Sequence, residues 1–184
     1  MGRRNTIDRD HVLQVAEGIV ATQGAGALTI DAVAKAAGIT KGGVQSCFGT
    51  KEAMVAAMLR RWMAEDDRLF AEAGGNGQTP VGRVLAHIET TRRHDAAAHT
   101  RAASLLTALL QTPEHLVEAR RWYEARLKGL ECDTEEGRQA TLAFLAAEGA
   151  FFLRFFGLLS IDHKQWERIF ADIGKLVPAQ PGNP

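Results

Sequence analysis

The sequence predicts an all-α protein of about nine helices, and three observations predict this fold class. Apolar residues recur at spacings of three and four positions along most of the chain, as they do on one face of a helix. No segment shows the apolar–polar alternation of a strand, and no hairpin turn or internal repeat is found. The 184 residues are 46% hydrophobic and 24% charged, an ordinary balance for a folded chain with a buried core.

The amino-terminal part of the chain predicts four helices in succession. Threonine stands before three of them, and its side-chain oxygen accepts hydrogen bonds from the free amides of a first helical turn. Glycine follows the first two, because it readily adopts the backbone conformation that ends a helix. The first expected helix carries the apolar stripe from Val12 to Val20 and is ended by Gly24 and Gly26. The others are Ile30–Ala37, Lys41–Cys47 and Lys51–Ala73, with caps at Thr29, Thr40 and Thr50 and a break at Gly38.

The carboxy-terminal part predicts the remaining helices after a loop at Gly74–Pro80, which is rich in glycine and turn residues. Apolar residues at helical spacing place two helices around 81–88 and 105–110. Thr112 followed by Pro113 starts the next, which carries 116–130. Asp133 or Thr134 caps the following helix, and a last one carries 166–177 before Pro178.

Composition excludes several classes of protein. The first 63 residues hold eight basic and five acidic side chains, a balance of +3, so the remainder balances to −3. This distribution is typical of a basic amino-terminal module on a slightly acidic body. The chain has only two cysteines, opens with no apolar leader, and carries Glu148 and Arg154 inside its most apolar stretch. We therefore expect a cytoplasmic protein with neither a disulfide framework nor a membrane span.

The segment Ile30–Cys47 has the pattern of a helix-turn-helix. Ala34 is small where a second helix would cross the first, and Gly38 permits the turn between them. Apolar residues that would lock the two helices together are Val33, Ala37, Ile39, Val44 and Cys47. A generic helical hairpin uses the same glycine turn and remains the alternative on these residues alone.

The longer segment Ala27–Leu59 resembles the TetR family of bacterial transcriptional regulators. The residues that carry the resemblance are Leu28-Thr29, Val33-Ala34, Ala37-Gly38-Ile39, Thr40-Lys41-Gly42, Phe48, Lys51-Glu52 and Met54. The rest of the chain matches the family by its helical length and order rather than by a motif. The resemblance implies a DNA-binding helix-turn-helix domain at residues 1–50. It also implies a helical effector-binding and dimerisation domain at 51–184, with the helix 51–73 as the link.

The expected DNA contacts lie around the second helix of this motif. Thr40 and the amides of Lys41–Gly43 form a helix amino terminus, which attracts phosphate, and Gly42 and Gly43 let the backbone come close to DNA. Where the family usually has Tyr or His, this chain has Gln45, Ser46 and Cys47, and a glutamine can contact adenine with two hydrogen bonds. Cys47 is interpreted as a packed residue, with a redox sensor as the alternative. The candidate DNA-binding residues are Arg3, Arg4, Thr29, Thr40, Lys41, Gly42, Gly43, Gln45, Ser46 and Lys51.

The stretch Ala140–Ile161 is apolar on nearly every side, so both of its faces need cover. One stripe holds Leu142, Leu145, Gly149, Phe152 and Phe156, and another holds Phe144, Phe151, Phe155 and Leu158. Together with the last helix, this predicts a four-helix homodimer interface, and a dimer supplies two recognition helices to a symmetric operator. The candidate interface residues are Gly149, Phe152, Phe156, Trp166, Ile169, Phe170 and Ile173. A central buried helix of a monomer is the alternative.

An effector site is expected in the carboxy-terminal helices, as the family resemblance implies. The candidate lining residues are Trp62, Met63, His87, His94, Leu106, Leu110, Trp122 and Phe144, and their mostly apolar character favours a hydrophobic or aromatic effector. Arg154 pairs with Glu148, binds an anionic ligand or reaches the surface.

The sequence therefore predicts a homodimeric repressor that a small effector releases from operator DNA. An enzyme is disfavoured, because the chain lacks HExxH, GxxxxGK[ST] and GxSxG. No cofactor is expected. His94, Asp95 and His99 lack the spacing of a metal site on one helix face. A helical ligand sensor without DNA binding is the other alternative.

Overall fold

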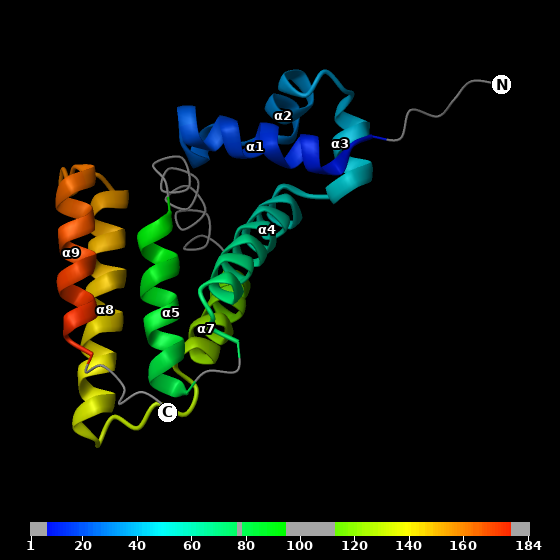
Figure 1. Ribbon diagram of the computed structural model, residues 1–184. Coiled ribbons are helices and arrows are strands. Elements are labelled where there is room, and N and C mark those ends of the chain that lie inside the picture. Colours follow the sequence, from blue (N-terminus) through cyan, green and yellow to red (C-terminus); the bar gives the residue numbers. More distant parts are fainter. Residues whose placement is uncertain (1–6, 77–78, 95–112, 178–184) are drawn as a thin grey trace. The chain divides into compact units, whose positions relative to one another are not determined.

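The structure, a computed structural model, describes residues 7–76, 79–94 and 113–177. In these residues it has eight α-helices, one short 3-10 helix and no strand (Figure 1). The all-α prediction is confirmed, and the expected count of about nine helices is close to that observed. The elements are α1 Arg9–Gln23, η1 Ala25–Ala27, α2 Ile30–Ala36, α3 Lys41–Phe48, α4 Lys51–Glu72, α5 Pro80–Arg93, α7 Pro113–Leu127, α8 Glu135–Phe155 and α9 His163–Lys175.

The chain divides into two compact units. The first comprises residues 1–63 and 100–116, and the second comprises 64–99 and 117–184. The division falls inside α4, which is one continuous helix from Lys51 to Glu72, and inside α7, between residues 116 and 117. Among the described residues, no helix combines the length and the apolar character that crossing a bilayer would need.

Threonine caps and glycine breaks shape the first unit as the sequence predicts. The Thr29 hydroxyl accepts from the amide of Ala32 at 3.0 Å, and the Thr40 hydroxyl accepts from the amide of Gly43 at the same distance. Gly24 and Gly38 have φ angles of +82° and +66°, which side chains with a Cβ rarely adopt. Gly49, which follows α3, also has a positive φ angle, +76°. The helix α3 therefore ends at Phe48, one residue later than expected.

The core of the first unit joins α1, α2, α3 and the beginning of α4. Val33 and Val44 are fully buried, one from each helix of the predicted helix-turn-helix, and Met54 of α4 is buried with them. Because these residues lock α2 and α3 together, the remaining face of α3 is left to solvent.

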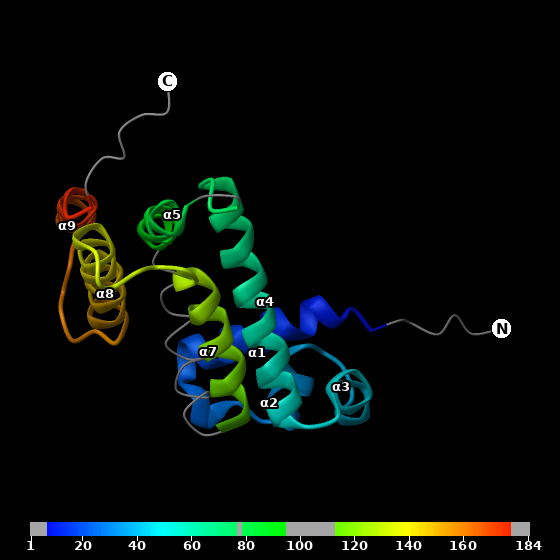
Figure 2. The same ribbon diagram turned by 90° about the horizontal axis from the view of Figure 1, so that it is seen from below.

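In the second unit, α5 packs on α8 and α9, and these two pack on each other (Figures 1 and 2). Thr134 is the residue that caps α8, which settles the choice between it and Asp133. The loop before α5 was expected to include Pro80, but it ends at Thr79. The Thr79 hydroxyl caps α5 by accepting from the amide of Gly82 at 3.1 Å, and Pro80 opens the helix.

The helix α8 ends at Phe155, before the end of the apolar stretch that predicted it. Gly157 takes a φ of +65°, and the amides of Leu158 and Leu159 return to the carbonyl oxygen of Leu153 at 2.9 and 3.0 Å. This turn closes the helix although the sequence stays apolar to Ile161, because the glycine conformation, not hydrophobicity, sets the boundary.

Gly137 in the first turn of α8 generates a stability prediction. A Cβ at this position would lie 1.9 Å from the carbonyl oxygen of Glu131. We expect Gly137→Ala to lower the free energy of unfolding by about 1–3 kcal/mol, the usual range for overpacking. Urea unfolding followed by circular dichroism measures the change.

The matched control is Gly174→Ala in α9, where an added Cβ meets no atom within 4 Å. Alanine favours a helix over glycine by up to about 1 kcal/mol, so this variant should be neutral or stabilised. Equal stabilities of the two variants would contradict the steric account of Gly137.

Candidate functional site

The outer face of α3 presents a row of small and polar side chains. Val44 and Phe48 anchor the helix inside the first unit, and Gln45 and Ser46 between them are exposed. The Cys47 side chain is half-buried and packs against the same core, in agreement with its interpretation as a packed residue. Two hydrogen-bonding side chains therefore lie side by side on a helix whose inner face is fixed, an arrangement that fits a DNA major groove.

The two glycines of α3 occupy different environments. Gly42 is exposed, and a Cβ added there would meet no atom within 4 Å, so its surface is open to an approaching molecule. Gly43 is buried, and a Cβ there would lie 2.9 Å from Cδ1 of Ile7. The expectation that both glycines face DNA thus fits Gly42, whereas Gly43 lies against the Ile7 side chain inside the unit.

The basic residues around α3 are placed at its edges. Lys41 forms a 3.0 Å ion pair with Asp31 of α2, and both side chains are more than half exposed. Lys51 begins α4 and is half-buried, and Thr29 caps α2 at the surface. Arg3 and Arg4 lie outside the described residues.

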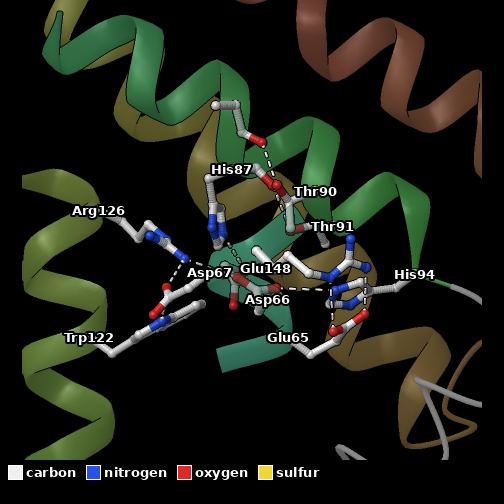
Figure 3. A network of polar contacts seen from close by, with 12 residues as sticks. Glu65, Asp66, Asp67, His87, Thr90, Thr91, His94, Trp122, Arg126 and Glu148 are labelled. Carbon is white, nitrogen blue, oxygen red and sulfur yellow. Dashed lines mark hydrogen bonds and ion pairs between the residues drawn. The ribbon is translucent and has the colours of Figure 1, made fainter. Parts of the chain in front are cut away.

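The second unit contains a group of polar side chains that we call the buried polar cluster. Asp66, His87, His94 and Arg126 are buried, and Tyr123 and Glu148 are half-buried. Figure 3 shows these residues other than Tyr123. The first half of the cluster is centred on the Asp66 carboxylate of α4, which is only 3% exposed. His94 Nε2 lies 3.1 Å from one carboxylate oxygen, and the Arg126 guanidinium lies 3.1 Å from the other. The same guanidinium nitrogen is 2.6 Å from Asp67, which also accepts a 2.9 Å hydrogen bond from the Trp122 indole.

The other half of the cluster is centred on Glu148 of α8. Its Oε1 lies 2.8 Å from His87 Nε2 on α5, and its Oε2 accepts a 2.6 Å hydrogen bond from the Tyr123 hydroxyl on α7. The cluster therefore ties α4, α5, α7 and α8 of the second unit together through two carboxylates.

Aromatic rings surround these polar groups. The Arg126 guanidinium lies 3.7 Å from the ring centroid of Phe70 and 4.5 Å from that of Trp122. The His87 ring stacks on Phe144 with 4.6 Å between centroids. A polar centre inside an aromatic shell is typical of a site that binds a small organic molecule.

The electrostatics of the cluster shift two pKa values. Burial alone would raise the pKa of the Asp66 carboxyl, but the hydrogen bond from His94 and the charges of His94, His87 and Arg126 hold it below its usual value. Burial, reinforced by the neighbouring Glu148 charge, raises the pKa of the Tyr123 hydroxyl far above its usual value. Asp66 is thus held as a carboxylate and Tyr123 as a hydrogen-bond donor.

The structure brings together half of the candidate effector residues. His87, His94, Trp122 and Phe144 all contribute to the cluster or to its aromatic shell. Trp62 instead packs against the core of the first unit, and Met63 is the half-buried last residue of that unit before the division. Leu106 and Leu110 lie outside the described residues.

Sequence reasoning missed Asp66, Tyr123 and Arg126 and did not assign Glu148 to the site. A signal was present in two cases: Asp66 stands four residues from both Trp62 and Phe70 on the apolar stripe of α4, and Glu148 stands four residues after Phe144 on the inner stripe of α8. A charge at a core position needs a partner, so such positions mark buried polar sites. The predicted pair of Arg154 with Glu148 is not formed. The Arg154 guanidinium lies over the Trp166 ring instead, 4.6 Å from its centroid.

The candidate interface residues divide into two groups. Trp166, Phe170 and Ile173 of α9 are buried inside the protomer at 1%, 3% and 6% exposure, and the Trp166 indole donates to the Arg92 carbonyl oxygen at 2.9 Å. They are therefore core residues of the protomer. This differs from the prediction that these three side chains form part of the surface that meets a partner chain. Phe156 is 43% exposed, whereas Gly149, Phe152 and Ile169 are half-buried.

An apolar strip on the outer side of α8 and the turn after it remains exposed. We call it the outer strip, and its residues are Leu142, Leu145, Leu153, Phe156, Leu158 and Leu159, with exposed fractions between 39% and 69%. The other predicted stripe is partly inside, since Phe144 and Phe151 are buried. The two stripes of the sequence thus become an inner face and an outer face of one helix.

Comparisons with known proteins cover both units. Residues 12–58 match the family model described as bacterial regulatory proteins, tetR family, and residues 81–178 match the one described as Tetracyclin repressor-like, C-terminal domain. No protein of curated function matches the sequence.

Several solved structures share the fold along nearly the whole chain. One is a transcriptional regulator from Rhodococcus sp. Rha1, with 21% identity and a TM-score of 0.71 over 93% of this chain and 96% of that one. Another is the multidrug binding protein EbrR complexed with malachite green, with 19% identity and a TM-score of 0.66 over 93% and 98%. A third is the ketosteroid transcriptional regulator KstR2 of Mycobacterium tuberculosis, with 17% identity and a TM-score of 0.61 over 97% and 98%.

The buried carboxylate of Asp66 generates a prediction of stability against pH. We expect Asp66→Asn to lower the free energy of unfolding at pH 7 by about 3 kcal/mol, the low end for a broken buried ion pair, because Arg126 keeps Asp67 as a partner. A carboxyl whose pKa is lowered by folding stabilises the protein above its unfolded pKa of about 3.9, and this contribution is lost as the pH falls through the folded value. The difference in the free energy of unfolding between wild type and variant should therefore have its whole value at pH 7 and pH 5 and should become smaller below about pH 4.

Urea unfolding at each pH measures this difference. Asp172→Asn is the control, since Asp172 is exposed on α9, where its carboxylate forms an ion pair with the equally exposed Lys175. A difference that is small at pH 7, or that is unchanged down to the acid limb, would show that Asp66 does not stabilise the unit as a carboxylate.

Proposed function

The chain belongs to the TetR family of bacterial transcriptional regulators, and on this premise we propose that it is a homodimeric repressor that a small effector releases from operator DNA. The observation that carries the proposal is the amphipathic α3, with Val44 and Phe48 anchored and Gln45 and Ser46 exposed. A recognition helix needs this combination, because base readout requires side chains that are held in place yet reach the groove.

In the proposed complex, α3 enters the major groove. Gln45 reads a base edge, while Ser46, Lys51 and the amides at the start of α3 contact phosphate. The exposed Gly42 allows the helix to approach the DNA backbone closely. The remaining proposed contacts are Arg3, Arg4, Thr29, Thr40 and Lys41, and Gly43 supports them from inside the unit.

A second copy of the chain covers the outer strip of α8 in this proposal. The strip gathers six exposed apolar side chains on one side of α8 and its following turn, which supports an interface there. Two copies would place two recognition helices on half-sites about 34–36 Å apart, one turn of DNA. Gly149 and Phe152, half-buried on the same helix, lie next to this surface.

The effector occupies the second unit, at the aromatic shell around the buried polar cluster. Two of the similar structures bear names that refer to organic molecules, the EbrR complex with malachite green and the ketosteroid regulator KstR2. We propose the functional boundary at 50/51, with α4 as the element that transmits effector binding, since it is continuous across the division between the units.

Selection of DNA fragments by the purified protein tests the function directly. Recovery of a palindromic sequence is expected, and titration of that fragment gives the salt dependence of binding. A protein that enriches no DNA sequence would instead be a ligand sensor without DNA binding. This second function is favoured by the presence of Gln45 and Ser46 where the family usually has aromatic residues.

Gln45 and Lys51 are expected to act differently on DNA. Gln45→Ala should relax the preference for one base pair in each half-site, at a cost on the order of 1–3 kcal/mol against the preferred base. Lys51→Ala should weaken binding to all sequences alike and reduce the slope of log K against log salt by about one. Titrations of the selected operator and its single-base variants, at several salt concentrations, measure both effects.

The controls are Gln14→Ala, an exposed glutamine of α1, and Lys175→Ala, an exposed lysine of α9. Neither should change preference or slope. If Gln45→Ala keeps the base preference, or Lys51→Ala keeps the slope, that residue is not part of the interface.

Leu145 tests the homodimer. It is 58% exposed, so Leu145→Glu should leave the protomer folded while placing a charge in the buried seam of the dimer. Sedimentation equilibrium at micromolar concentration should find a dimer for the wild type and a monomer for the variant, and operator binding should weaken with the loss of the second recognition helix. Val117→Glu, at a 45% exposed valine of α7, should remain dimeric. A monomeric wild type would refute the proposed assembly.

A further inference from the structure

Two helices that contact DNA in the proposed complex begin with a lysine. Lys41 is the first residue of α3, and Lys51 is the first residue of α4. A positive charge in the first turn of a helix is unfavourable, because the free amides there already carry partial positive charge. Both lysines are therefore suited to a negatively charged partner, such as the DNA phosphate proposed for them.

The two lysines differ in that Lys41 has a carboxylate beside it. Its Nζ lies 3.0 Å from Oδ2 of Asp31, the second residue of α2. Lys51 forms no ion pair within the described part of the chain. The charge of Lys41 is thus offset inside the first unit by a residue from the other helix of the helix-turn-helix.

The pair of Lys41 with Asp31 adds little to the stability of the unit. The two side chains are 57% and 70% exposed, and an ion pair in contact with water is screened and gives up side-chain freedom. The buried Val33 and Val44 already hold α2 and α3 together from inside. Asp31 is therefore not required to keep α3 in place, and its effect on the neighbouring charge is the larger one.

The Asp31 carboxylate lies next to the proposed phosphate contact. Thr40 caps α3 and Lys41 follows it, so the ammonium that pairs with Asp31 belongs to the helix start that would meet phosphate. Thr29, another proposed contact, caps the helix that carries Asp31 in its first turn. Two anions that contact the same ammonium are at most about 6 Å apart, and like charges at this separation repel each other.

We propose that Asp31 limits the affinity of the protein for the DNA backbone by offsetting the charge of Lys41. The carboxylate occupies the ammonium in the free protein and repels the phosphate in the complex. Both effects weaken binding to DNA of any sequence, so base contacts such as that of Gln45 supply a larger share of operator binding. This inference rests on the proposed function and adds to it a residue that opposes DNA binding.

Asp31→Asn tests the proposal on the full chain. Wild type and variant are titrated with the selected operator and with a DNA fragment of unrelated sequence, at salt concentrations from about 50 to 200 mM. The variant should bind both DNAs more tightly, at least about fivefold at the lowest salt, because Lys41 then offers its whole charge to a phosphate. The slope of log K against log salt should become steeper by about 0.9, so the gain should shrink about threefold to fourfold across this range.

Asp172→Asn is the matched control for the change in net charge. Asp172 pairs with Lys175 on α9 of the second unit, and both side chains are at least as exposed as those of the Asp31 pair. This variant should leave affinity and slope unchanged, because α9 contributes no proposed DNA contact. Adding Lys41→Gln to Asp31→Asn should remove the added slope, since the cation that gained the phosphate is then absent. A slope that stays steep would show that the gain does not come from Lys41.

The sign of the change separates this role of Asp31 from two others. If Asp31 held α3 in place, Asp31→Asn would weaken operator binding, and if Asp31 read a base, the variant would lose its preference for one base pair in each half-site. Either result, or an affinity and slope equal to those of the wild type, would overturn the inference while a wild type that binds operator keeps the proposed repressor. A wild type that binds no DNA would refute the proposed repressor and this inference with it.

Discussion

The need to pair a buried charge organises the second unit. Asp66 lies on the apolar stripe of α4, and a carboxylate removed from water at that position would be strongly unfavourable without partners. Its partners come from elsewhere in the chain, His94 at the end of α5 and Arg126 on α7. Glu148 repeats the arrangement with His87 and Tyr123. Apolar contacts permit many packings of four helices, but two carboxylates that each need particular donors select one register among them.

The first unit solves a different problem, because it must hold α3 firmly and still leave its outer face bare. Apolar anchors at Val44 and Phe48 achieve the first condition, and the buried Gly43, closed over by Ile7, brings the chain before α1 into the same core. The caps at Thr29 and Thr40 satisfy amides that would otherwise compete for other partners. Rigidity of this kind is what lets a short helix present two side chains in a defined geometry.

Features decided by neighbouring residues could be predicted from the sequence far better than contacts between residues far apart in the chain. Threonine caps and glycine breaks are decided within a few residues, so Thr29, Thr40, Gly24 and Gly38 were predictable, and so was the all-α fold. The pairing of Asp66 with His94 and Arg126 depends on residues 28 and 60 positions away, and no local pattern encodes which side chains will meet. The fate of α9 shows the same limit. Trp166, Phe170 and Ile173 form an apolar face at the right spacing, but only the packing on α5 and α8 decides that this face is core rather than surface.

The two faces of α8 have a consequence for the evolution of this chain. The inner face carries Phe144 and Glu148 toward the cluster, while Leu142, Leu145 and Phe156 point away from it into the outer strip. Substitutions on one face scarcely touch the side chains of the other, because helical spacing separates the two sets. In the proposed dimer, gene duplication followed by drift on the outer strip would create copies that no longer assemble with one another, while the proposed effector site stayed the same. Drift on the inner face would instead change the proposed effector site and leave the proposed interface as it is.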